Sequence, residues 1–169
     1  RAHGIAVDTK NRGVFVSHTG SNRIYQFQFD PQNGRLRASA PPFLTTPDSH
    51  HPRHVMLHPS DRWAYTSDEA GDSISVFDVD TTASTLLLKQ TVSSIPADFD
   101  GAKNSTARCE ITPNGRFIFV ANRGHDSIAG FAIDQNTGRV RSLGQFPTEP
   151  TPRSFTISAD GRHLYAAGQ

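Results

Sequence analysis

Four segments of this 169-residue chain are variants of one pattern, and this internal repetition restricts the fold more than any other feature. One arginine in a polar turn sets the register of each segment: Arg12, Arg62, Arg116 and Arg162. Successive turn arginines are 50, 54 and 46 residues apart. A repeat of roughly 40–50 residues that is made of strands is the signature of a β-propeller blade. The repetition therefore predicts a propeller.

Within each repeat, two apolar runs flank a short polar turn, such as Asn114-Gly115 in the third repeat. Two apolar runs around Asn-Gly or Asp-Gly are typical of a β-hairpin. A second pair of strands follows each hairpin, and four antiparallel strands make one propeller blade. No segment has a convincing helical pattern. The fold class predicted is all-β, a β-propeller of four-stranded blades.

The repeats divide residues 1–169 into a single partial propeller domain, with blades at about 3–50, 51–105 and 106–150 and an incomplete blade at 151–169. Residues 93–106 form an insertion that we expect on one rim, where it shapes a binding face. Propellers close with typically 4–8 blades, so about three and a half blades predict that the remaining blades are missing from this chain. We expect the isolated segment to self-associate or to be poorly stable, because its ends are open.

The composition excludes several classes of protein. The net charge is +1 and no run of five basic residues occurs, which disfavours nucleic acid as a partner. No apolar run approaches the ~18 residues of a membrane span. Cys109 is the single cysteine, so no intrachain disulfide forms, and this favours a reducing, cytoplasmic location. Cys109 itself is interpreted as a small buried thiol.

Two positions break the repetition. The first, at the start of the innermost strand, holds His3, Arg53, Ala107 and Arg153, and the second, 16 residues later, holds Thr19, Glu69, Arg123 and Gln169. Because the two strands form a hairpin, both positions fall at one end of the blade. The sequence predicts a polar ring at one mouth of the channel. Such residues either are exposed and free to vary or bind an asymmetric small molecule, to which each blade contributes a different group.

Other chemical groups carry weaker signals. A local cluster of histidines lacks the spacing of converging metal ligands, so no metal site is expected, and His54 is interpreted as a neighbour of Arg53 in the pocket. Glu110 replaces an apolar residue and is expected to be a pocket acid or an ion-pair partner of Arg108. Neither a Gly-rich phosphate loop nor a Gly-x-Ser-x-Gly elbow occurs, which argues against nucleotide enzymes and serine hydrolases.

The stretch ANRGHDSIAGFAID, from Ala121 to Asp134, resembles the lactonase family of seven-bladed β-propellers. The segments PRHVMLHPSDRWAYTSDE from Pro52 and TPRSFTISADGRHLYAAGQ from Thr151 match the same family pattern. The resemblance covers essentially the whole chain, which corresponds to about half of a complete member. It implies a ring of seven blades. It also implies catalytic groups at four of the positions that vary between the repeats: His3, Arg53, Glu69 and Arg123.

Lactone hydrolysis needs a water activated near the ester carbonyl and stabilisation of the oxyanion that develops. His3 or Glu69 is expected to act as general base, while Arg53 and Arg123 hold negative charge. The residues expected to contact the substrate are His54, Asn122, Arg153 and Glu110. No cofactor is expected.

The function predicted is a lactonase of carbohydrate metabolism that opens a sugar lactone, 6-phosphogluconolactone in the first place. The alternatives are a carboxy-muconate lactonizing cyclase and a non-catalytic propeller that binds a ligand or a protein. Fold alone does not choose among these three. The asymmetric polar mouth favours catalysis.

Overall fold

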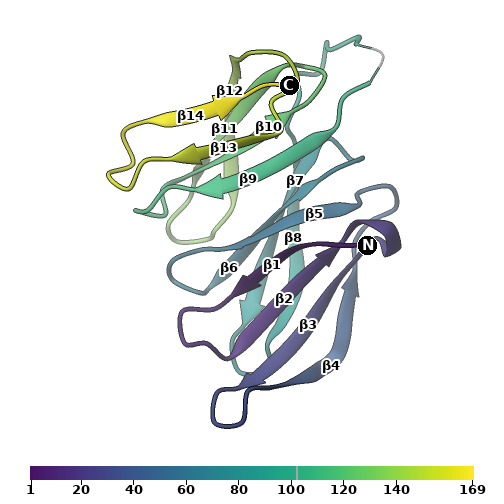
Figure 1. Ribbon diagram of the computed structural model, residues 1–169, viewed down its shortest axis with the longest axis vertical. Coiled ribbons are helices and arrows are strands. Elements are labelled where there is room, and N and C mark those ends of the chain that lie inside the picture. Colours follow the sequence, from purple (N-terminus) through teal and green to yellow (C-terminus); the bar gives the residue numbers. More distant parts are fainter. Residues whose placement is uncertain (102) are drawn as a thin grey trace.

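The computed structural model describes residues 1–101 and 103–169, and these residues form three four-stranded antiparallel sheets and one two-stranded hairpin (Figure 1). In each sheet, strands that follow one another in sequence are also hydrogen-bonded neighbours. The strands of the first sheet are β1 (Ala2–Val7), β2 (Gly13–His18), β3 (Arg23–Asp30) and β4 (Arg35–Thr45). Those of the second are β5 (Pro52–Leu57), β6 (Trp63–Asp68), β7 (Ser73–Asp80) and β8 (Thr85–Ser93).

The third sheet and the hairpin complete the described structure. The third sheet consists of β9 (Thr106–Ile111), β10 (Phe117–Asn122), β11 (Ser127–Ile133) and β12 (Val140–Pro147). The hairpin is formed by β13 (Ser154–Ile157) and β14 (Leu164–Ala167). One short 3₁₀-helix, η1 (Thr19–Ser21), follows β2. No helix in the described ranges is long and apolar enough to cross a membrane. The all-β prediction with four strands per repeat is confirmed.

The turn between the first two strands of each repeat needs one residue with positive φ. The residues at this position are Asn11, Asp61, Gly115 and Gly161, with φ of 59°, 57°, 69° and 70°. Glycine, asparagine and aspartate reach the left-handed region at the lowest cost, which explains why these types recur beside the turn arginines.

The hydrophobic core lies between the sheets rather than within one of them. Phe15, Ile24, Val55 and Phe77 form the cluster between the first and second sheets. Trp63 and Tyr65 belong to the cluster between the second and third. A smaller cluster that includes Phe155 joins the third sheet to the hairpin. Each blade is therefore stabilised by its neighbours.

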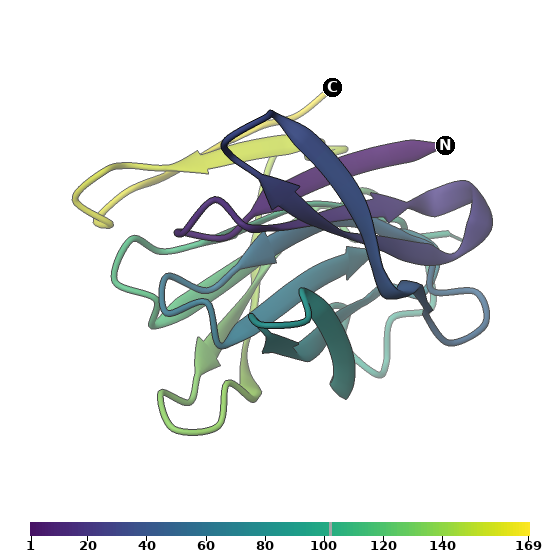
Figure 2. The same cartoon turned by 90° about the horizontal axis from the view of Figure 1, so that it is seen from below.

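The innermost strands meet along one side of this stack. β1 contacts β5, β5 contacts β9, and β9 contacts β13. The chain passes from the first sheet at the bottom of Figure 1 to the hairpin at the top, and Figure 2 shows β1 and the hairpin on the same side of the stack. This arrangement places the first strand of every repeat toward a common axis.

Repeated hydrogen bonds fix how consecutive blades meet. The hydroxyl of Ser17 donates to the carbonyl of Arg53 at 2.7 Å, and the equivalent hydroxyl of Ser67 donates to the carbonyl of Ala107 at 2.7 Å. Because each bond ends on the first varying position of the next repeat, the joint between blades orients the residues at the mouth of the channel.

Candidate active site

The two varying positions of each repeat lie at the same end of the hairpin, here called the mouth. Strand register pairs Ala2 with His18 in the first sheet and Pro52 with Asp68 in the second. In the third, Thr106 pairs with Asn122. The start of each innermost strand therefore lies beside the end of the next strand, as the sequence predicts.

One carboxylate lies between two guanidinium groups at the mouth. Oε1 of Glu69 accepts a hydrogen bond from Nη2 of Arg123 at 2.6 Å and lies 3.5 Å from Nε of Arg53. Burial opposes ionisation of Glu69, but the hydrogen bond from Arg123 and the charges of both arginines outweigh it and lower the pKa of Glu69. The Glu69 carboxylate is thus charged and occupied by arginines from its own and the next sheet.

Arg123 is held by the segment that precedes β9. Its Nε donates to the carbonyl of Ser105 at 3.2 Å, and its Nη2 donates to the Ser105 hydroxyl at 2.6 Å. Nη2 also reaches the carbonyl of Thr106 at 3.3 Å. Among the described residues Nη1 has no hydrogen-bond partner. The guanidinium is therefore fixed along one edge and leaves the other edge for a ligand.

Arg53 is more deeply buried, with 4% of its side chain exposed. Its Nη1 donates to Nε2 of His54 at 3.2 Å. Its Nε is buried without a hydrogen bond in the described structure, even though Glu69 is near. Burial and the charge of Arg123 lower the pKa of Arg53. A buried donor without a partner is a position that an anionic ligand or a water would satisfy.

Two imidazoles face one another beside these arginines. The rings of His3 and His54 meet edge to face, with centroids 5.3 Å apart. Burial and the charge of Arg53 lower the pKa of His3 below 6.5 and that of His54 to about 4. Both rings are therefore neutral at neutral pH. Nδ1 of His3 is buried and has no hydrogen-bond partner in the described structure, whereas His54 accepts from Arg53.

The other residues expected to contact a substrate are placed differently. The amide of Asn122 is fully buried and exchanges hydrogen bonds of 2.8 Å with Ser94. Glu110 pairs with Arg108 at 3.0 Å and accepts from the backbone N–H of Ile157 at 3.2 Å, so it joins β9 to β13. Arg153 is exposed, and its charge contributes to the lowered pKa of Arg53. The structure brings His54 and Arg153 toward the cluster but not Asn122 or Glu110.

Ser105 is the residue at the mouth that sequence comparison missed. It lies in the insertion, which has no counterpart in the other repeats, so the register could not assign it to a position. Its place directly before an innermost strand was the one available signal.

Other candidates for chemistry are occupied or inaccessible. Burial raises the pKa of the Cys109 thiol to about 12, which disfavours the nucleophilic thiolate. The histidines near position 50 make separate contacts: His50 with Asp68, His51 with the carbonyl of Thr19, and His58 with the carbonyl of Gly115. The described residues contain no group of three or more side chains that could hold a metal ion.

Sheets that are packed face to face around an axis, with a charged cluster at one mouth, define this chain as part of a β-propeller with an axial polar site. The model of the family described as "Lactonase, 7-bladed beta-propeller" matches residues 1–169, so the chain belongs to that family. Both the fold class and the family resemblance predicted from the sequence are confirmed.

Similar proteins agree with this assignment. The chain is 32% identical over 167 residues to a 6-phosphogluconolactonase of Serratia proteamaculans, a match that covers 99% of this chain and 50% of the relative. The periplasmic gluconolactonase PpgL of Pseudomonas aeruginosa superposes with a TM-score of 0.91 at 29% identity, over 100% of this chain and 47% of that one. A protein from Lactobacillus plantarum gives a TM-score of 0.90 at 26% identity, over 100% and 48%. The chain thus spans about half the length of the relatives it matches.

Proposed function

We propose that this chain is part of a lactone hydrolase that opens a sugar lactone, with 6-phosphogluconolactone as its substrate. The observation that carries the proposal is the cluster of Arg53, Glu69 and Arg123 beside a neutral His3. It combines an uncharged base with fixed positive charge, which is the combination that ester hydrolysis requires. The names of the similar proteins supply the substrate class.

His3 is the general base in this proposal. Its pKa is lowered, so it is unprotonated at neutral pH, and its Nδ1 has no described partner. Glu69 suits this role less well, because Arg123 and Arg53 already occupy its carboxylate. Glu69 instead fixes the two guanidinium groups and offsets their mutual repulsion.

The reaction then runs in two steps. His3 takes a proton from water while the water oxygen forms a bond to the lactone carbonyl carbon, whose oxygen becomes an oxyanion. The tetrahedral intermediate collapses, the ring C–O bond breaks, and the imidazolium returns its proton to the departing alkoxide. The product is the open-chain hydroxy acid.

The arginines bind negative charge in both steps. A guanidinium offers forked donors that suit a phosphate, a carboxylate or an oxyanion. Arg53 lies deepest in the cluster and is assigned to the developing oxyanion. Arg123, whose Nη1 has no described partner, is assigned to the phosphate of the substrate.

The test is hydrolysis of 6-phosphogluconolactone by the intact protein, followed by pH-stat titration of the acid released. Unphosphorylated gluconolactone serves as the matched substrate without the phosphate. We expect faster turnover of the phosphorylated lactone and a loss of that preference in Arg123→Gln. Acceleration of neither lactone would overturn the proposal in favour of a binding propeller, and conversion of a carboxy-muconate would favour the cyclase.

A further inference from the structure

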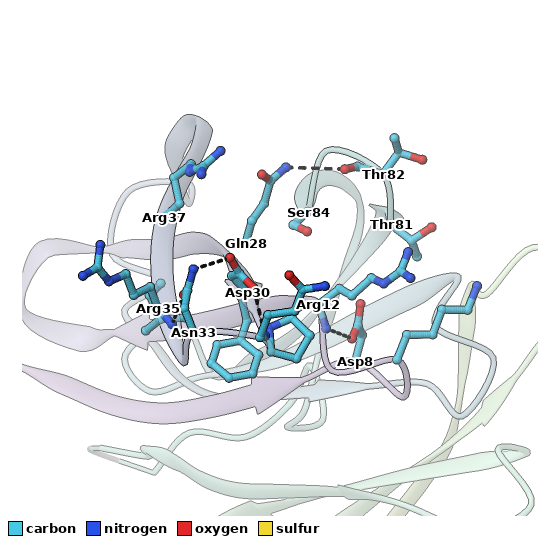
Figure 3. Close-up of a pocket in the computed structure, with 15 residues that line it drawn as sticks. Asp8, Arg12, Gln28, Asp30, Asn33, Arg35, Arg37, Thr81, Thr82 and Ser84 are labelled. Atoms are coloured by element: carbon cyan, nitrogen blue, oxygen red, sulfur yellow. Dashed lines mark hydrogen bonds between the residues drawn. The ribbon is translucent and has the colours of Figure 1, made fainter.

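A cavity of about 910 Å³ opens at the end of the sheets opposite the mouth (Figure 3). It lies between the first two sheets and is lined by the β1–β2 turn, the β3–β4 turn and the β7–β8 turn. Asp8 on its wall follows His3 by five residues, a separation of roughly 16 Å at the rise of a β-strand. The cavity is therefore separate from the candidate active site.

Strand register identifies which side chains face the second sheet. Gln28 on β3 donates to the carbonyl of Ala83 at 3.3 Å across the gap between the sheets. Gln28 pairs directly with Arg37 on β4, and Asp30 pairs with Arg35, so these side chains share one face of the first sheet. Figure 3 shows Gln28 and Arg12 with Thr81, Thr82 and Ser84 of the β7–β8 turn opposite them.

The lining contains more positive than negative charge. Four cationic side chains border the cavity, and the only carboxylates there are two aspartates; the cations are Lys10, Arg12, Arg35 and Arg37. In the part of the chain that the structure describes, the side chains of these four form neither an ion pair nor a hydrogen bond.

Neither aspartate forms an ion pair with these cations in the described structure, and their carboxylate oxygens accept hydrogen bonds within their own turns. Asp8 accepts the backbone N–H groups of Arg12 at 2.7 Å and Gly13 at 3.0 Å. Asp30 accepts the backbone N–H of Gln32 at 2.9 Å and the side-chain amide of Asn33 at 2.5 Å. The cavity therefore presents unpaired guanidinium groups beside hydroxyl groups.

The repeats show that this charge is not a property of every blade. The second sheet keeps the turn arginine, Arg62, but its guanidinium stacks on Trp63 and donates to the carbonyl of Gln135 at 2.8 Å. Register places Thr85 and Leu87 where the first sheet has Arg35 and Arg37. The third repeat has Arg116, Arg139 and Arg141 at the positions of Arg12, Arg35 and Arg37, so the arginine pattern distinguishes the first and third repeats from the second. The cavity itself lies between the first two sheets.

We propose that this cavity is a binding site for a small multivalent oxyanion of the phosphate class, such as a pyrophosphate or a phosphate ester. Arg12 and Arg37 would supply the forked donors. Gln28, Thr82 and Ser84 would supply neutral polar contacts to the rest of the ligand. The site is independent of the lactone chemistry proposed for the mouth.

The test is calorimetric titration of the intact protein with inorganic pyrophosphate at low and at physiological salt. We expect binding at this cavity that weakens as salt rises and that is distinct from any phosphate binding at Arg123 in the mouth. The double variant Arg12→Gln/Arg37→Gln should weaken binding by about tenfold or more, as loss of charged hydrogen bonds implies. The double variant Arg12→Lys/Arg37→Lys keeps the positive charges but loses the forked guanidinium donors. Its affinity for pyrophosphate should lie between those of the glutamine variant and the native protein.

Two further variants make the test specific. Arg62→Gln removes one positive charge at the equivalent turn position outside this cavity, and Arg123→Gln removes an arginine from the mouth. Both should keep the pyrophosphate site. The proposal would be overturned if the native protein did not bind pyrophosphate, or if Arg62→Gln lost as much affinity as the double variant. It would also be overturned if Arg123→Gln lost binding while the double variant kept it. Unchanged circular dichroism and lactone turnover in the double variant show that it is folded.

Discussion

The imidazole of His3 is the group whose protonation state decides how the proposed reaction runs. General-base catalysis contributes typically ~10²–10⁴-fold in rate, so His3→Gln should lower kcat by a factor in that range. Exposed His163, in the turn of the C-terminal hairpin, is the matched control, and His163→Gln should leave kcat unchanged. Equal turnover by the native protein and His3→Gln would remove His3 from the mechanism.

The lowered pKa of His3 predicts the shape of the pH profile. A base must be neutral to accept a proton, and burial beside Arg53 keeps the pKa of His3 below its ordinary value of 6.5. As pH falls, kcat/KM should therefore stay level past 6.5 and decline only below it. The measurement is kcat/KM against pH after correction for spontaneous hydrolysis. A decline centred above 6.5 would contradict the environment described for His3.

Ser105 is expected to act as a positioning residue for Arg123. A hydrogen bond to a charged group contributes about 1.5–3 kcal/mol, and Arg123 keeps other partners, so Ser105→Ala should lower kcat/KM by about tenfold. Ser105→Thr retains the hydroxyl and should restore most of the activity. Ser142→Ala, at an exposed position on β12, is the control. A purely structural role would appear as lost stability with unchanged kinetics.

At the scale of elements, the turn between the third and fourth strands allows a matched comparison of two glycines. Gly34 and Gly138 have φ of 69° and 72° at equivalent turn positions. A Cβ at position 138 would lie 2.3 Å from Cδ2 of Trp63, whereas position 34 has nothing within 4 Å. Gly138 thus combines a left-handed conformation with a close approach to the core.

Both Gly→Ala variants should lose roughly 1–2 kcal/mol from the left-handed conformation. Gly138→Ala should lose about 1–3 kcal/mol more, because the new methyl group displaces Trp63. Denaturant unfolding of the intact protein measures both values. Equal losses would show that the indole moves aside without cost.

The hairpins of this fold could be predicted from sequence because their determinants are local. A left-handed turn residue such as Asn11 or Gly115 lies next to the strands that it connects, and four repeats give the same information four times. The mouth residues were found because they vary where the scaffold recurs. The hydrogen bonds that hold Arg123 to Ser105 could not be predicted, since they depend on how the irregular segment before β9 crosses the end of β10.

The same limit explains why Asn122 and Glu110 were expected at the pocket, although the alternative expected for Glu110, an ion pair with Arg108, is present. Asn122 directly precedes Arg123 of the mouth, but strand alternation turns its amide into the protein, where Ser94 and Ser127 bind it. Glu110 is drawn toward β13 by Arg108 and the backbone of Ile157. Whether a polar residue in a strand faces the channel or a neighbouring blade depends on three-dimensional packing.

At the scale of the whole molecule, the outer face of the first sheet carries exposed apolar side chains. Ile5 is 66% exposed and Leu36 is 55% exposed, on the side of the sheet that faces away from the second sheet. Every other four-stranded sheet of the described structure packs on both faces. The face therefore has the composition of a blade interface but no neighbouring blade in residues 1–169.

This asymmetry predicts the behaviour of the isolated 169-residue segment in solution. Contact between outer faces would bury apolar surface, so sedimentation velocity should show association that increases with concentration. Ile5→Lys/Leu36→Lys should shift the segment toward monomer, because a charge on this face opposes burial. Leu87, 67% exposed on the second sheet, is the control, and Leu87→Lys should leave association unchanged. A native segment that stays monomeric and unfolds in one sharp thermal transition would show that this half of the propeller is stable with an uncovered blade face.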